Sequence, residues 1–308
     1  MVRLALGRLG SVVPTLVGVV TLVFAFLHLL PGDPVEIMLG ESAAPADVAL
    51  LRHDLGLDRP LPVQYVGFLE RALHGDLGRS LAFHEPVSEL IARRYPATVQ
   101  LAMAAFVLAV GVGVPAGVLA AVRAGSITDR LVRTAGVIGL CLPGFWLGPL
   151  LILAFSIELG WLPVSGRGGV THLILPAATL AVGMASVLLR LTRASMLAAL
   201  GGDYVRTARA KGLPEWRVLA AHALRNALLP VTTVAGLQAG GLLGGAVLTE
   251  TIFAWPGLGR LLVQAIEARD YPLVQGCVLV IGTSYLIVNT VTDLLYLAID
   301  PRLRDAAP

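Results

Sequence analysis

The residue types that commonly carry out chemistry occur in this 308-residue chain, but their spacing fits no catalytic motif. The single lysine, Lys211, is followed by Gly212, whereas the lysine of a P-loop is followed by Ser or Thr. Neither the G-x-S-x-G pattern of hydrolases nor the H-E-x-x-H pattern of zinc enzymes is present. We therefore expect no catalytic residue, no cofactor-binding residue and no metal site in this chain.

A dense group of basic residues instead marks the segment 201–228. Its turn residues predict two short helices with a break between them. Asp203 is placed to cap the first helix, Gly212 to close it in a left-handed conformation, and Pro214 to open the second. Such a shape is typical of a surface that another molecule contacts.

The second of these helices is predicted to have an apolar face and a basic face. The apolar positions recur at helical spacing, at Trp216, Leu219, Ala220, Ala223, Leu224 and Ala227. Through charge alone the loop could lie on anionic lipid. The turn between two small helices favours the alternative, a groove on a soluble partner, because lipid binding does not need that shape.

Long apolar stretches must position this loop. The chain is 56% hydrophobic and only 14% charged, whereas soluble domains have about 25% charged residues. A helix needs roughly 20 apolar residues to cross the hydrocarbon core, and no stretch shows the alternation of barrel strands. The qualifying stretches are 9–30, 98–122, 134–157, 172–192, 229–250 and 273–295. We predict an all-α integral membrane protein with a six-helix bundle.

The distribution of arginine predicts the orientation of the bundle. Arginines are frequent before the first stretch, at 123–133 and at 190–228, whereas the short loops on the other side hold only Arg167, Arg260 and Arg269. Basic residues accumulate on the cytoplasmic side. Both termini and the 201–228 loop are therefore predicted to be cytoplasmic.

The predicted spans are almost free of charge. No Asp, Glu, Lys or Arg occurs within residues 9–30, 98–122, 134–157, 172–189, 226–249 and 271–292. Ionisable groups inside the membrane are typical of proton-coupled carriers, so their absence argues against that class. Sodium coupling through backbone carbonyls stays open. A self-contained secondary carrier or channel is thus the alternative to transport driven by a separate energy source.

Two further groups of residues are candidates for contact with a solute or a partner. Phe253, Trp255, Pro256, Gly257 and Leu258 form an apolar turn after the fifth span, which we expect either to anchor at the membrane interface or to reach an external protein. Uncharged polar residues inside the bundle could line a path or could bond helices together. These residues are Thr232, Thr233, Gln238, Ser284 and Asn289.

The basic loop resembles the EAA loop of ABC-importer permeases, through which ATPase subunits drive the transmembrane subunits. Gly212 matches the glycine of that loop and Ala208 its second alanine. Arg206, Thr207 and Arg225 depart from the general pattern, and in these departures the loop is similar to that of the peptide branch.

Other blocks along nearly the whole chain resemble the dipeptide/oligopeptide/nickel permease family, B-type subunit. The blocks are 30–34, 55–60, 64–65, 75–80, 250–259 and 269–272. The resemblance implies a bundle of the type I ABC importer kind, with both termini inside. It divides the chain into an N-terminus and first helix at 1–30, an external helical segment at 31–97, and a permease core at 98–308 with its coupling loop at 201–228.

The resemblance also implies partners and a location. It predicts a second homologous permease subunit, one or two ATPase subunits that carry ATP and Mg, an extracytoplasmic substrate-binding protein, and surrounding lipid in a bacterial inner membrane. It implies no nucleic acid. The substrate would be a di- or oligopeptide, with nickel chelates or another small solute as the alternative. The residues expected to couple to the ATPase are Asp203, Arg206, Ala208, Arg209, Lys211, Gly212, Trp216 and Arg217.

Overall fold

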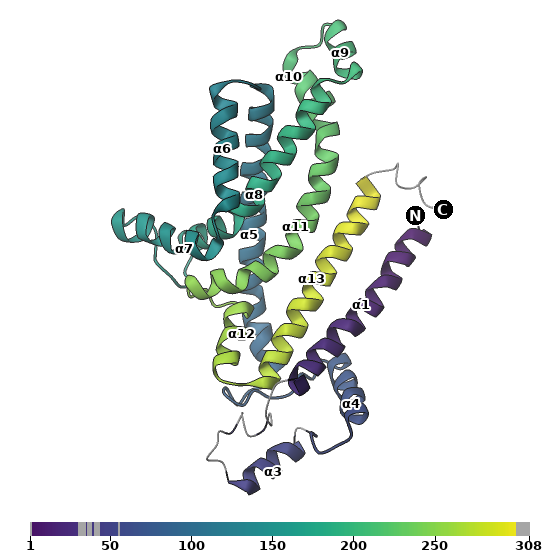
Figure 1. Ribbon diagram of the computed structural model, residues 1–308, viewed down its shortest axis with the longest axis vertical. Helices are drawn as coiled ribbons and strands as arrows, with labels where there is room; N and C mark the ends of the chain where they lie inside the picture. The colour runs from purple at the N-terminus through teal and green to yellow at the C-terminus, as the bar shows by residue number, and fades with distance from the viewer. Residues whose placement is uncertain (1, 30–34, 36–38, 40–43, 55, 300–308) are drawn as a thin grey trace.

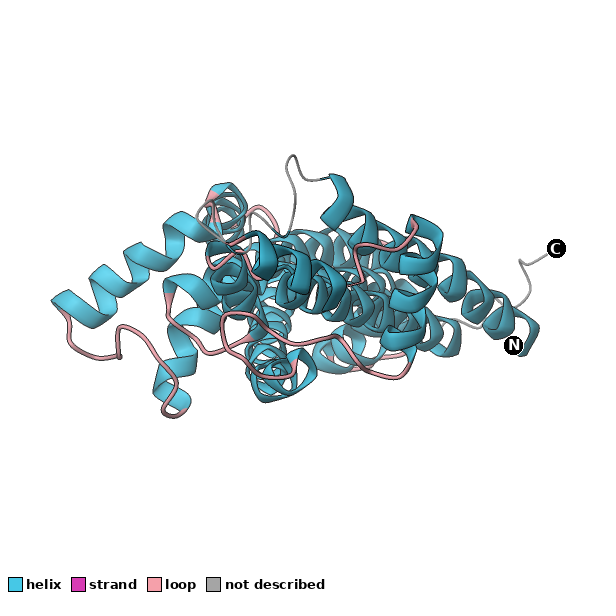
Figure 2. Ribbon diagram, turned by 90° about the horizontal axis from the view of Figure 1, so that it is seen from below, coloured by secondary structure: helices cyan, strands magenta, loops and turns pink. Residues whose placement is uncertain are grey.

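The computed structural model describes residues 2–29, 35, 39, 44–54 and 56–299, and in these residues the chain is a bundle of helices without a named strand (Figures 1 and 2). The block at 30–34, part of the family resemblance, lies outside the described residues. An all-α membrane bundle is therefore confirmed.

The long helices correspond to the predicted spans. α5 (Val87–Val122), α8 (Val170–Leu200) and α13 (Tyr271–Ile299) each contain a stretch long and apolar enough to cross a membrane. The same is true of the continuous helical stretch that ends with α11 (Arg225–Ile252). In α1 (Val2–Leu29) the apolar stretch found within the described residues is shorter, at Val12–Ala25.

The third predicted span, 134–157, is not one straight helix. α6 (Ile127–Cys141) ends, and α7 (Gly144–Leu151) with the π-helix η1 (Ile152–Glu158) leaves it at an angle of 108°. Pro143 causes the break, because the residue before a proline avoids the helical conformation, and Leu142 is extended, at φ −79° and ψ 114°. α7 therefore projects sideways from the bundle (Figure 1).

α5 and α8 share the most extensive helix contact, and two glycines one turn apart bring their backbones together. A Cβ atom at Gly113 would lie 2.6 Å from the carbonyl oxygen of Ala185, and one at Gly117 would lie 2.6 Å from that of Leu189. Small residues spaced by four allow the backbones of membrane helices to approach closely. We call Gly113 and Gly117, with the backbone of α8 that they contact, the glycine seam.

Gly117→Ala is expected to destabilise the protein, although alanine is the better helix former. The new methyl group would push α5 and α8 apart, at a cost of about 1–3 kcal/mol. Gly111→Ala is the matched control, because Gly111 has open space around it, and there the substitution should be neutral or stabilise by roughly 0.5–1 kcal/mol. Thermal unfolding in detergent measures the stability of both variants. Equal unfolding midpoints for Gly117→Ala and Gly111→Ala would contradict close backbone packing at the glycine seam.

The external segment includes α3 (Pro45–Asp54) and α4 (Leu61–Leu73), at the end of the molecule opposite α9 (Figure 1). α4 is held on α1 by a 2.7 Å hydrogen bond between the hydroxyls of Thr21 and Tyr65 and by an edge contact between the rings of Phe24 and Tyr65. Near the start of α13, the buried carboxylate of Asp270 accepts a hydrogen bond of 2.5 Å from the Ser80 hydroxyl. The external segment is thus packed on the bundle.

Candidate functional site

The loop between α8 and α11 folds into a compact helical projection at the predicted cytoplasmic end (Figure 1). It comprises α9 (Asp203–Ala210), a turn, and α10 (Glu215–Arg217), and we call residues 203–217 the knob. The side chains of Val205 and Ala208 are buried in one apolar cluster with Met196 of α8. This cluster attaches the knob firmly to the end of the bundle.

The turn inside the knob depends on Gly212, which has a φ of +76° as predicted. The N–H of Gly212 donates to the carbonyl of Arg209 at 2.9 Å, and the N–H of Leu213 donates to that of Ala208 at 3.4 Å. These two bonds make a Schellman motif with glycine at the left-handed position. The motif fixes the direction in which the chain leaves α9.

An ion pair joins the two sides of this turn. The guanidinium of Arg209 donates to the carboxylate of Glu215 at 2.6 Å, and this hydrogen bond raises the pKa of Arg209. On α9, Arg206 lies 3.4 Å from Asp203, and both side chains are almost fully exposed. Exposed pairs contribute little to stability, so the arginines remain available to a partner.

The rest of the exposed surface of the knob is basic and aromatic. The Trp216 ring is 65% exposed and the guanidinium of Arg217 lies over it, 5.1 Å from the ring centre. Lys211 is also exposed, beside the turn. Tryptophan and arginine are enriched among residues that dominate protein interfaces.

We predicted that Asp203 caps α9, and this prediction is wrong. Gly202 occupies the N-cap position, no side chain caps the helix, and Asp203 is its first residue. The carboxylate is still favourably placed, because negative charge stabilises the first turn of a helix.

The apolar face predicted for the second helix was partly wrong. Val218 is buried, whereas Trp216 and Ala220 are exposed. The reason is the π-helix η2 (Val218–Leu224) between α10 and α11. A π-helix bonds each residue to the fifth one along, so the buried side chains are Val218 and then Ala223, five residues later.

The external turn after α11 is buried instead of exposed at the interface. Phe253 and Trp255 are each 1% exposed and Leu258 is fully buried, while Gly257 is buried and Pro256 partly so. These apolar side chains are therefore neither membrane anchors nor available to a docked protein in this conformation.

The Trp255 indole shows what holds this turn in place. Its N–H donates to the carbonyl of Ala97 on α5 at 2.8 Å, and the ring lies in one apolar cluster with Leu101 and Ala177. The guanidinium of Arg167 lies 5.7 Å from the centre of the same ring. Trp255 thus fastens the turn to the outer end of α5.

Glu250 is a buried carboxylate that the sequence reasoning missed. Its side chain is fully buried, accepts a hydrogen bond of 2.6 Å from the Thr98 hydroxyl, and accepts one of 3.0 Å from the N–H of Arg260. The Thr98 oxygen in turn accepts a hydrogen bond of 2.7 Å from the N–H of Leu258. This network joins α5, α11 and the first turn of α12 (Leu258–Glu267).

A second missed feature is an ion pair near the predicted cytoplasmic ends of α6 and α8. Arg193 donates two hydrogen bonds, of 2.7 and 2.8 Å, to the two carboxylate oxygens of Asp129, which is 2% exposed. Asp129 also accepts one from the N–H of Gly125 at 3.0 Å. A signal was present, because Ser126 and Asp129 have the spacing of a helix start, but the partner is distant in sequence.

The five residues predicted as candidates for lining a solute path differ in exposure and in hydrogen bonding. The hydroxyl of Thr233 donates to the carbonyl of Leu229, and Thr232, which does the same, is exposed. Gln238 is partly buried. Ser284 is 6% exposed and forms a hydrogen bond of 2.8 Å with Tyr95 on α5, so it joins two helices.

Asn289 faces the neighbouring helix. A Cβ atom at Gly240 of α11 would lie 2.8 Å from the Asn289 amide oxygen. That oxygen is buried and has no hydrogen-bond partner among the described residues. The chain therefore leaves an acceptor unsatisfied between α11 and α13.

Comparison with known proteins matches both parts of the chain to transport components. Residues 113–305 match the model of the binding-protein-dependent transport system inner membrane component, and residues 1–102 match the model of its N-terminal part. The dipeptide transport system permease protein DppB of Escherichia coli K12 is 46% identical over 336 residues, with 99% of each chain covered. The glutathione transport system permease protein GsiC of Pectobacterium atrosepticum is 47% identical over 304 residues, again with 99% of each covered.

The fold is also similar to a solved structure. An inward-facing conformation of the MetNI methionine ABC transporter superposes with a TM-score of 0.57 at 21% identity, over 68% of this chain and 96% of that one. At this identity the likeness concerns the fold alone.

Proposed function

We infer the function of this chain from the family to which it belongs, the binding-protein-dependent transport system inner membrane components. It is an inner membrane permease subunit of a binding-protein-dependent ABC importer, and it is not catalytic alone. Such a subunit works with ATPase and binding-protein partners. The alternative of a self-contained secondary carrier is therefore set aside.

We propose that the knob is the surface that the ATPase subunits bind. The observation that carries this proposal is its construction: a Schellman turn and an ion pair fix two short helices in one shape, and their basic and aromatic side chains face solvent. Because the buried side of the knob is continuous with the core at the end of α8, a force on the knob passes directly into the bundle.

A short peptide is the substrate that we propose. Two relatives at 46% and 47% identity are named for dipeptide and for glutathione transport, and the alignments cover 99% of this chain. A path with uncharged polar groups suits a zwitterionic peptide, since fixed charges of either sign would hold one of its ends too strongly.

A second, homologous permease subunit completes the path in this proposal. α11 carries an uncovered face, on which Leu237 and Leu248 are more than half exposed and Gly241 and Gly244 have open space. Thr232 is exposed on the same helix. The uncovered face would meet its counterpart across the path, and the extracytoplasmic binding protein would deliver the peptide from the side of α3 and α4.

Gly212→Pro and Arg209→Glu are expected to abolish co-purification of the ATPase and ATP-driven peptide uptake. Proline cannot adopt the positive φ of Gly212, and glutamate at 209 would oppose Glu215 and reverse the charge of the surface. Loss of one charged contact at an interface costs about 2–5 kcal/mol, which corresponds to at least a tenfold loss of affinity. Affinity chromatography of the co-expressed subunits measures the association.

Arg130→Glu is the matched control, because Arg130 is an exposed arginine outside the knob at the predicted cytoplasmic end. It should leave association unchanged. If both knob variants associated with the ATPase as strongly as the wild type does, the proposed contact between the knob and the ATPase would be refuted. Transport by this chain alone in vesicles without ATP would overturn the whole proposed mechanism.

A further inference from the structure

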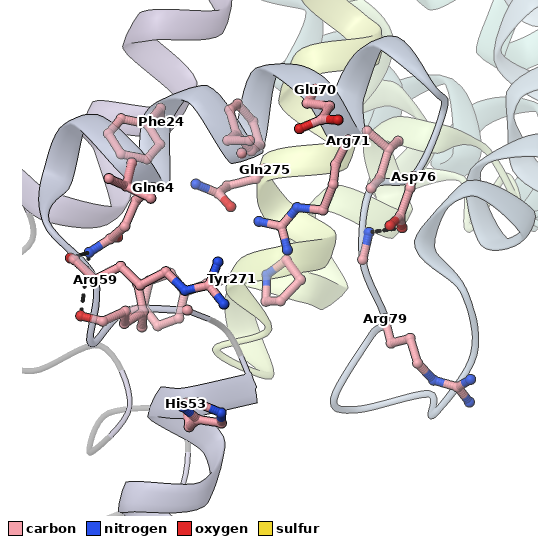
Figure 3. A pocket seen from close by; sticks show the side chains of 18 residues that line it. Phe24, His53, Arg59, Gln64, Glu70, Arg71, Asp76, Arg79, Tyr271 and Gln275 are labelled. Atoms are coloured by element: carbon pink, nitrogen blue, oxygen red, sulfur yellow. Dashed lines mark hydrogen bonds between the residues drawn. The ribbon is translucent and has the colours of Figure 1, made fainter.

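A cavity of about 360 Å³ lies where α4 crosses the outer ends of α1 and α13 (Figure 3). It lies at the end of the molecule opposite the knob (Figure 1). Its apolar and amide lining includes Phe24, Leu57, Gln64, Phe68, Tyr271 and Gln275. A volume of this size is in the range of small-molecule sites, about 300–1,000 Å³.

Two arginines give this cavity its chemical character. The guanidinium groups of Arg59 and Arg71 point into it (Figure 3). Within the part of the chain that the structure describes, neither forms an ion pair with a carboxylate. Two carboxylates, Glu70 and Asp76, and a third arginine, Arg79, also line the cavity. Its arginines therefore outnumber its carboxylates, which favours an anionic ligand.

The depth of the cavity indicates where that anion comes from. Gln275 is four residues into α13, which places it roughly 6 Å below the outer end of that helix. The headgroup layer on each side of a bilayer is about 5–8 Å thick. Phe24 belongs to α1, and its ring packs against that of Phe68 of α4, with 5.9 Å between the ring centroids. The floor of the cavity is thus made by α1 and α13, and a bilayer surface that lies where α13 begins would place Arg59 and Arg71 near the headgroups.

We propose that the cavity binds the phosphate of a phospholipid from the outer leaflet. Guanidinium groups bind phosphate oxygens through two parallel hydrogen bonds, and the apolar floor suits the glycerol and the first methylenes of the acyl chains. A bound lipid would join α4 to α1 and α13, beside the hydrogen bond from Gln275 to the carbonyl of Val23. This inference goes beyond the proposed function and does not depend on it.

The test uses the purified transporter complex and native mass spectrometry, with dihexanoylphosphatidylglycerol, glycerol 3-phosphate and inorganic phosphate as probes. The double variant Arg59→Gln/Arg71→Gln should weaken binding of the short-chain lipid roughly a hundredfold, since each charged hydrogen bond contributes about a factor of ten. Arg93→Gln/Arg94→Gln, the control, removes two external arginines that do not line the cavity and should change binding less than about twofold. Arg59→Lys/Arg71→Lys keeps the charge and should retain part of the binding.

Each outcome decides between the possible sources of the anion. Tighter binding of the lipid than of either free phosphate, lost only in the cavity variant, supports the proposal. Equal lipid binding by wild type and cavity variant would overturn it. So would inorganic phosphate that binds as tightly as the lipid, because the site would then serve a free anion. Unchanged lipid binding together with weakened docking of the binding protein would assign the arginines to a protein contact instead.

Discussion

Glu250→Ala is expected to destabilise the permease by about 3 kcal/mol or more. The substitution leaves the Thr98 hydroxyl and the N–H of Arg260 buried without an acceptor, and each unpaired buried group costs about 1–3 kcal/mol. It also removes the carboxylate from the N-terminal end of α12, where negative charge is favourable. Thermal unfolding of the detergent-solubilised protein, followed by loss of the monodisperse peak, measures the effect.

Two variants separate this role from a general effect of charge. Glu250→Gln keeps one acceptor oxygen and should lie between wild type and Glu250→Ala. Glu267→Ala removes an exposed carboxylate at the other end of α12, and it should change stability by less than about 0.5 kcal/mol. If Glu250→Ala unfolded at the same temperature as Glu267→Ala, the hydrogen-bond network around Glu250 would make no measurable contribution to stability.

Arg193→Gln is expected to have the second large effect, about 3 kcal/mol, because it removes the two charged hydrogen bonds to the buried carboxylate of Asp129 and leaves it only the more exposed Arg133, 3.7 Å away. The bidentate geometry, at 2.7 and 2.8 Å, links α6 to α8 close to the knob. Loss of this link should also reduce ATP-driven uptake in the fraction that folds. Expression yield, thermal unfolding and uptake into vesicles give the three readouts.

The control for this pair is on the same helix. Arg190 is exposed, so Arg190→Gln should be near wild type. The double variant Asp129→Leu/Arg193→Leu should be more stable than Arg193→Gln, since replacing both members of a buried pair avoids an unpaired charge. A double variant less stable than the single one would argue that the pair itself contributes net stability.

The apolar runs predicted most of the fold, because the requirement to cross a bilayer leaves a clear signal in composition. The left-handed turn at Gly212 was also predictable, since few other residues adopt that conformation without cost. Both features depend on local sequence alone.

What the sequence did not reveal depends on contacts between distant residues. Trp255 belongs to a turn that we expected to be exposed, and Glu250 lies in the last turn of α11; their packing on Ala97 and Thr98 of α5 buries both. The π-helix η2 changes the spacing of buried side chains, so a pattern based on 3.6 residues per turn misplaced Ala220. Prolines alone do not predict where a span bends, because the chain breaks at Pro143 whereas Pro96, Pro115 and Pro176 are accommodated inside helices.

The glycine seam also has a mechanical consequence. Because the backbones of α5 and α8 touch at Gly113 and Gly117, we expect a movement of one helix there to carry the other with it. α8 leads into the knob through only Gly201 and Gly202, while the outer end of α5 holds Trp255 and Glu250. With 31 residues, α8 is roughly 46 Å long. A rotation of about 10° around its midpoint would move each end by about 4 Å, so we expect a small displacement of the knob to move the outer end of α8 by a similar distance.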